Sequence, residues 1–134
     1  MALRNQPYLP LYVNDFLSDE KLLRCSAEST GVYIRLMCLL HKSEKYGVFI
    51  LSERDKKTEN QIKNFAFVLL TLLPYDLLTI ERSLDDLIYR GVLVIDGNTL
   101  LQKRMVKDGE LSQTRAMSGS RGGRPTKKQN KSKT

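Results

Sequence analysis

The side chains best able to do chemistry are basic and gather at the end of the chain. From Arg115 to Thr134 the sequence has seven Lys and Arg residues and no Asp or Glu. The whole chain has 22 Lys and Arg against 15 Asp and Glu, so residues 1–114 hold 15 of each sign and have no net charge. Clustered cations of this kind neutralise the phosphates of nucleic acids without reading base sequence.

The same stretch lacks the composition of a folded segment. From Ser118 to Thr134 there is no large apolar side chain, so burial cannot offset the entropy lost on ordering the chain. We therefore expect a domain over residues 1–114 and a disordered basic tail or linker over residues 115–134. The predicted DNA contacts in this tail are Arg115, Arg121, Arg124, Lys127 and Lys128. A linker without DNA contacts is the alternative.

A second basic cluster precedes the tail. Lys103, Arg104 and Lys107 lie within five residues, next to the acidic Asp108 and Glu110. We interpret the three cations as DNA contacts. The alternative is an ordinary charged start of a helix, because clusters of charge are often simply solvated.

Patterns that indicate catalysis or metal binding are missing from the sequence. It contains no G-x-x-x-x-G-K-[ST], H-E-x-x-H or G-x-S-x-G motif. Cys25, Cys38 and His41 are its only cysteines and histidine, and none has metal-ligand spacing. The acidic pair Asp85-Asp86 provides neither a metal cage nor an acid/base dyad, and we expect it on a solvated helix face. We predict a protein that is not an enzyme and needs no cofactor or metal.

The sequence also predicts a cytoplasmic protein without a membrane partner. No run of 18 or more apolar residues is present, which excludes an apolar membrane-spanning helix. The opening MALRNQPYLP lacks the apolar core of a signal peptide.

The elements that must position the charges are mostly helices. Pro7–Leu17 is predicted to be extended, and a short helical turn follows. Ser26 can cap a helix that runs to Lys42 and repeats apolar residues on one face. Tyr46–Ser52 predicts a short strand.

Two more helices and a hairpin follow. Thr58 opens a capping box, and the helix after it is expected to continue to Pro74. A third helix is predicted from about Asp76 to Arg90, closed by a glycine. Asp96-Gly97-Asn98 between two apolar runs predicts a tight β-hairpin.

This order predicts a mostly α fold with a small β-hairpin, namely a winged helix-turn-helix domain. In such domains the helix before the hairpin usually enters the major groove, which makes Arg82 and Arg90 candidate groove contacts, and Lys103, Arg104 and Lys107 contacts near the wing. The predicted outer face of this helix nevertheless sums to −1 over Glu81, Arg82, Asp85, Asp86, Tyr89 and Arg90. A negative face is a poor partner for phosphate-lined grooves.

Two segments resemble a known family. LYVNDFLSDEKLLRCSAESTGVYIRLMCLL is similar to the opening of the N-terminal domain of phage and prophage replisome-organizer proteins, and LLQKRMVKDGELSQTRAMSGSRGG is similar to its close. Together they span nearly all of residues 8–124. The resemblance implies a winged helix akin to that of DnaD-type primosomal proteins, which works in the initiation of DNA replication. In this family a second region after the domain contacts the helicase-loading machinery. We expect DNA as a partner, with further copies of the chain and helicase-loading proteins as additional candidates.

Two other functions stay open. The first is a protein-interaction or self-association module of a primosome in which the tail is only a linker, and the acidic third helix favours it. The second is a prophage transcription regulator, which would need a basic recognition helix and usually a dimer.

Overall fold

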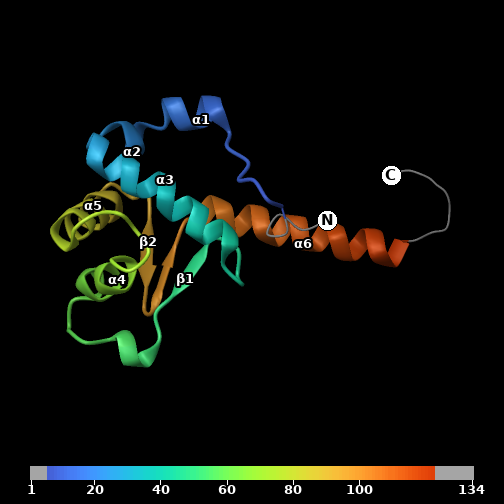
Figure 1. The fold of residues 1–134 in the computed structure, drawn as a ribbon. Helices are drawn as coiled ribbons and strands as arrows, with labels where there is room; N and C mark the ends of the chain where they lie inside the picture. The colour runs from blue at the N-terminus through green and yellow to red at the C-terminus, as the bar shows by residue number, and fades with distance from the viewer. Residues whose placement is uncertain (1–5, 123–134) are drawn as a thin grey trace.

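Helices make up most of the described chain, and a small antiparallel sheet lies among them (Figure 1). The structure is a computed structural model that describes the backbone of residues 6–122 and the side chains of residues 6–114. The predicted class, mostly α with a small β-hairpin, is confirmed. The helices are α1 (Val13–Ser18), α2 (Glu20–Leu23), α3 (Ala27–Lys42), α4 (Gln61–Leu69), α5 (Leu77–Tyr89) and α6 (Lys103–Gly122), and the strands are β1 (Val48–Ile50), β2 (Val94–Asp96) and β3 (Thr99–Leu101).

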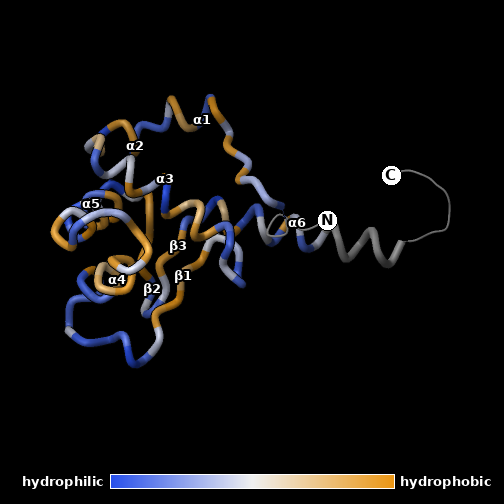
Figure 2. The backbone as a smooth tube through the Cα atoms, in the orientation of Figure 1, coloured by the Kyte–Doolittle hydropathy of each residue, from blue (hydrophilic) through white to orange (hydrophobic). Residues whose placement is uncertain are grey.

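The core lies between α3, α4, α5 and the sheet. Helix α5 packs against both α3 and α4. The side chains that fill this space are at most 1% exposed: Val32, Leu36, Leu40, Phe65, Leu69, Ile80, Leu84, Leu87, Leu93 and Leu100. Figure 2 shows apolar positions on α4 and along the strands, whereas the loop between β1 and α4 is hydrophilic.

The three strands have the spatial order β1-β3-β2. The predicted hairpin is confirmed: Asp96 pairs with Thr99, and Gly97 has a φ of 61° in the two-residue loop. Strand β1 pairs with β3 through Phe49 and Leu100, so the hairpin acquires a third strand that the sequence analysis did not place beside it.

The caps of α3 and α5 agree with the sequence analysis. Ser26 accepts a hydrogen bond from the backbone amide of Ser29 at 3.0 Å. Asp76 caps α5, and Gly91, with a φ of 81°, follows its end. These are local signals, because the Ser26 and Asp76 side chains accept from an amide in the first turn of their own helix.

The prediction of an extended segment over Pro7–Leu17 is wrong for its second half, because Val13–Ser18 forms α1. The amide of Phe16 donates to the carbonyl of Tyr12 at 2.9 Å, and the Ser18 hydroxyl donates to the carbonyl of Asn14 at 2.8 Å. Regular structure therefore begins only after the two prolines of this segment.

The predicted boundaries of α4 are also wrong. Asn60, not Thr58, caps the helix, accepting from the amide of Lys63 at 3.1 Å. Thr58 instead lies in a preceding turn, where its hydroxyl accepts from the amide of Asn60 at 3.0 Å. The helix ends at Leu69, five residues before Pro74, although Leu73 is still buried.

Helix α6 begins directly after the hairpin and has 20 residues. The predicted boundary between residues 114 and 115 falls inside it. An ideal Cβ at Gly109 would lie 2.7 Å from Cβ of Tyr46, so the Tyr46 side chain packs on the bare backbone of α6. Gly47 packs on the preceding turn of the same helix.

Gly47→Ala is expected to destabilise the domain more than Gly97→Ala. Both glycines have positive φ, at 84° and 61°, so each alanine meets a backbone cost of about 1–2 kcal/mol. A Cβ at Gly47 would also lie 2.7 Å from the Val106 backbone nitrogen, whereas nothing lies within 4 Å at Gly97. Thermal unfolding checks this, and equal losses would mean that α6 does not pack here.

Candidate nucleic-acid interface

The start of α6 is held firmly against the body. Gln102 accepts from the amide of Met105 at 2.7 Å through its side-chain oxygen and donates to the Tyr33 hydroxyl at 3.1 Å through its side-chain nitrogen. Its backbone amide donates to the Gly47 carbonyl at 3.1 Å. Because Met105 is buried, the first turn of α6 has a fixed rotation about its axis.

This rotation turns Lys103 and Lys107 outward. Both side chains are exposed. Across residues 6–114, no acidic side chain forms an ion pair with either ammonium group. Two of the three predicted contacts on α6 are therefore available to an outside anion.

Arg104 lies in a different environment. Its Nη1 donates to Oδ2 of Asp15 at 2.7 Å, its Nε lies 4.0 Å from Oδ2 of Asp108, and its Cζ lies 4.0 Å from the centre of the Tyr12 ring. The hydrogen bond to Asp15 raises the pKa of Arg104 above its ordinary value. This third predicted contact is exposed as well, but its guanidinium is already paired with a carboxylate of the same chain.

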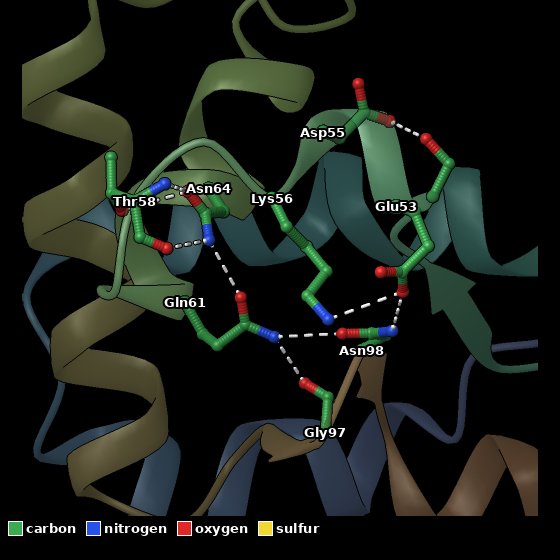
Figure 3. A network of polar contacts seen from close by, with 9 residues as sticks. Glu53, Asp55, Lys56, Thr58, Gln61, Asn64, Gly97 and Asn98 are labelled. Carbon is green, nitrogen blue, oxygen red and sulfur yellow. Dashed lines mark hydrogen bonds and ion pairs between the residues drawn. The ribbon is translucent and has the colours of Figure 1, made fainter.

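The hairpin tip lies at the opposite end of β3 from these cations. Figure 3 shows the tip tied to α4 and to the loop before it: Gln61 donates to the Gly97 carbonyl at 2.6 Å. Asn98 donates to Glu53 at 3.2 Å. The basic cluster therefore lies at the base of the hairpin and not at its tip. Its members Lys103, Arg104 and Lys107 are in the first turns of α6, which is the position that the alternative interpretation, a charged start of a helix, gives them.

A buried asparagine organises this network (Figure 3). Asn64 is fully buried, and its amide nitrogen donates to the Thr58 carbonyl at 2.9 Å and to Gln61 Oε1 at 2.8 Å. Its oxygen accepts from the amide and the hydroxyl of Thr58, each at 2.9 Å. With all these bonds made, Asn64 fixes Gln61 and through it the hairpin tip. In the sequence, the role of Asn64 is indicated only by the fact that a polar residue stands on the apolar face of a predicted helix.

The candidate groove contacts on α5 are paired with acids. Arg82 donates to both oxygens of Glu28 at 2.8 and 2.7 Å, and this hydrogen bonding lowers the pKa of Glu28. Arg90 lies 3.9 Å from Asp86. Arg82 thus joins α5 to the first turn of α3, whereas the Arg90 pair lies within the end of α5.

Asp85 is exposed, as expected, whereas Asp86 is half-buried and bonded to α3, which corrects the expectation for this one member of the pair. Asp86 accepts from the Ser29 hydroxyl at 2.7 Å and from the Ser26 amide at 3.1 Å. The hydrogen bond from Ser29 lowers the pKa of Asp86. The carboxylate thus joins α5 to the first turn of α3.

The segment Gln6–Ser18, which we call the N-terminal strap, crosses the body beside α3 and α6 (Figure 1). The buried His41 binds the Gln6 carbonyl through Nε2 at 2.9 Å and the Tyr46 hydroxyl through Nδ1 at 2.8 Å. Because a carbonyl can only accept, Nε2 carries a proton. A neutral His41 then accepts from Tyr46 at Nδ1.

The side chains of the DNA contacts predicted in residues 115–134 lie outside the part of the chain that the structure describes. Arg115 and Arg121 belong to the backbone of α6, and their side chains lie outside the described part of the structure. Arg124, Lys127 and Lys128 lie outside the described residues altogether.

Within the described residues, no group of three or more His, Cys, Asp or Glu side chains could hold a metal ion. No helix in that part of the chain has the length and the apolar character needed to cross a bilayer. Comparison of the sequence and structure with protein-family models, curated proteins and solved structures finds no match.

Proposed function

We propose that residues 1–114 form a winged helix-turn-helix domain that binds DNA. The order of α3, β1, α4, α5 and the β2–β3 hairpin supports the proposal, as does a sheet in which β1 pairs with β3. In this plan α4 and α5 are the helix-turn-helix pair, and the hairpin is the wing.

The surface proposed to contact DNA starts on α6. The observation that carries the proposal is the pair Lys103 and Lys107, which are exposed and have no acidic partner within residues 6–114. Their helix leads into a sequence with seven further basic residues and no acid. Such a cationic surface binds phosphates by releasing counterions and positions the protein without reading bases.

The resemblance to replisome organizers supplies the biological setting of the proposal. The chain binds DNA when phage or prophage replication begins in the cytoplasm, with helicase-loading proteins and further copies of itself as candidate partners. In this role contacts with the DNA backbone are sufficient, because origin choice can rest with other proteins.

A second candidate function is a protein-interaction module, and the surface of α4 and α5 favours it. Lys63 pairs with Glu81 at 3.7 Å, and the α5 arginines are paired as well. Large apolar side chains are 36–63% exposed around the corner between the two helices: Phe67, Leu70, Leu72 and Leu78. A paired, partly apolar surface suits a protein partner better than phosphates.

Replacing Lys103 and Lys107 together with alanine is expected to weaken binding to every DNA sequence. Loss of two phosphate contacts should reduce the slope of log K against log salt by about 2, at about 0.9 for each contact. Fluorescence anisotropy with a short duplex at several salt concentrations measures this slope.

The matched control is the double change Arg54→Ala and Lys57→Ala. It removes the same charge from two exposed side chains in the loop near the hairpin tip. If both double variants lose the same affinity, the two lysines of α6 contribute no more than charges beside the hairpin tip, and the DNA surface proposed on α6 is wrong. If the full chain does not bind DNA even at low salt, the protein-interaction module takes the place of the proposal, and sedimentation analysis would then test self-association.

A further inference from the structure

The N-terminal strap reaches the proposed DNA surface at one residue. Arg104 lies between Lys103 and Lys107 in sequence, yet its guanidinium faces Asp15 and the Tyr12 ring of the strap. The other two cations face solvent. One cation of the proposed DNA surface is therefore covered by a segment about 90 residues away in sequence.

Asp15 occupies one of the donor positions of Arg104, at Nη1, where a phosphate oxygen would bind with the same geometry. The carboxylate oxygen lies 2.7 Å from Nη1, which is the distance of a charge-assisted hydrogen bond to either a carboxylate or a phosphate. Arg104 cannot make this bond to both anions with the same nitrogen hydrogen. Binding of Asp15 and binding of a phosphate at this position exclude each other.

The strap is weakly held around this contact. Helix α1 has no buried residue and no side-chain cap, and its Val13 and Leu17 are 58% and 65% exposed. The ion pair itself is exposed, with 48% of the Arg104 side chain and 60% of the Asp15 side chain accessible. Exposed pairs of this kind contribute little to stability.

Packing beneath the strap is also incomplete. A cavity of about 110 Å³ lies between the strap and the body. Leu9 and Phe16 close it from the strap, and Tyr33, Met37 and Met105 line it from the body. Leu9 and Phe16 are half-buried and pack against the core, so lifting this part of the strap breaks the contacts of these two side chains, whereas Val13 and Leu17 are already exposed. The Gln6 carbonyl bound to the buried His41 remains as a second attachment point.

We propose that the N-terminal strap is an intramolecular competitor of DNA, in which Asp15 covers Arg104 until a phosphate displaces it. This inference rests on the proposed DNA-binding function of α6 and adds its regulation. DNA that binds to Lys103 and Lys107 brings a phosphate next to Arg104, and the ion pair between Arg104 and Asp15 opens. The part of the strap around Asp15 then leaves the body, while Gln6 stays attached. Anything that holds the strap down lowers DNA affinity.

The first test compares Asp15→Asn with Glu59→Gln in the full chain, using anisotropy with a short duplex at low salt. Both changes remove one negative charge. Glu59 is exposed in the loop before α4, and no ion pair joins it to another residue of the described chain. We expect Asp15→Asn to raise the affinity for the duplex by about 2–5-fold more than Glu59→Gln does. This factor corresponds to the free energy of an exposed ion pair. Equal affinity in the two variants would overturn the proposal.

The second test repeats both changes in an Arg104→Ala background. Without Arg104 there is nothing for Asp15 to cover, so Asp15→Asn should then have the same effect as Glu59→Gln. A gain that persists without Arg104 would show a general charge effect and overturn the proposal. Circular dichroism at the same salt shows that each variant is folded.

The third test is amide hydrogen exchange of the unaltered chain with and without the duplex. Exchange in residues 6–18 should rise on DNA binding while exchange in α5 does not. A fall in strap exchange would overturn the proposal and leave DNA binding intact. Absence of any DNA binding by the unaltered chain and by all variants would instead overturn the proposed function together with the competitor.

Discussion

Leu84→Ala is expected to lower the free energy of unfolding by about 2–5 kcal/mol, and Leu87→Ala by a similar amount. Both side chains are fully buried on α5, the helix that packs against α3 on one side and α4 on the other. Truncation to alanine removes apolar contacts and leaves a cavity between α3, α4 and α5. All three helices would have to move to fill it. Chemical or thermal unfolding measures the loss.

Leu78→Ala on the same helix is the control, because Leu78 is 63% exposed. It makes the same change in composition and a similar change in helix propensity, yet removes little buried area, so its effect should stay within about half a kcal/mol. A loss below about half a kcal/mol for both Leu84 and Leu87 would mean that α5 presents a different face to the core.

Replacing all seven basic residues of the segment 115–134 with glutamine is expected to remove most of the salt dependence of DNA binding. Residues 1–114 carry no net charge, so this segment dominates the electrostatic attraction. Seven phosphate contacts would give a slope of log K against log salt of about −6. We expect the substitution to reduce the slope by about 3–5, because not every charge reaches a phosphate at once.

Glutamine is a good helix former, so this change keeps the part of α6 that lies beyond residue 114. A variant with residues 123–134 in shuffled order and unchanged composition is the control. It should keep the slope, because phosphate contacts carry no sequence information. An unchanged slope in the glutamine variant would show that the segment is a linker.

The parts of the fold that could be predicted are those fixed by neighbours in sequence. Ser26 caps α3 because its hydroxyl reaches an amide three residues on. Asp96 and Gly97 predicted the hairpin, because its tight turn requires a positive φ and Gly97 adopts one. The predicted outer face of α5 is likewise exposed at Arg82, Asp85 and Tyr89, while Ile80, Leu84 and Leu87 on the other face are fully buried.

Features fixed by contacts beyond a single helical turn could not be predicted in the same way. Thr58 satisfies the pattern of a cap, but the buried Asn64 draws it into a turn, and Asn60 takes its place. Nothing local to Arg104 shows that Asp15 binds it, since the two are 89 residues apart. The charges of the candidate site were visible in the sequence, whereas their partners depend on tertiary packing.

The contact between Tyr46 and Gly109 is a support point for α6, because the second half of the helix extends beyond it. The helix rests there on a tyrosine ring, and about 20 Å of helix extends from this point to Gly122, at about 1.5 Å per residue. A rotation of about 10° at this fulcrum moves the far end by about 3–4 Å. The hydroxyl of the same tyrosine binds His41, which holds Gln6. Tyr46 thus contacts α6 through its ring and reaches the start of the strap through His41, so one side chain connects the two ends of the chain's described part.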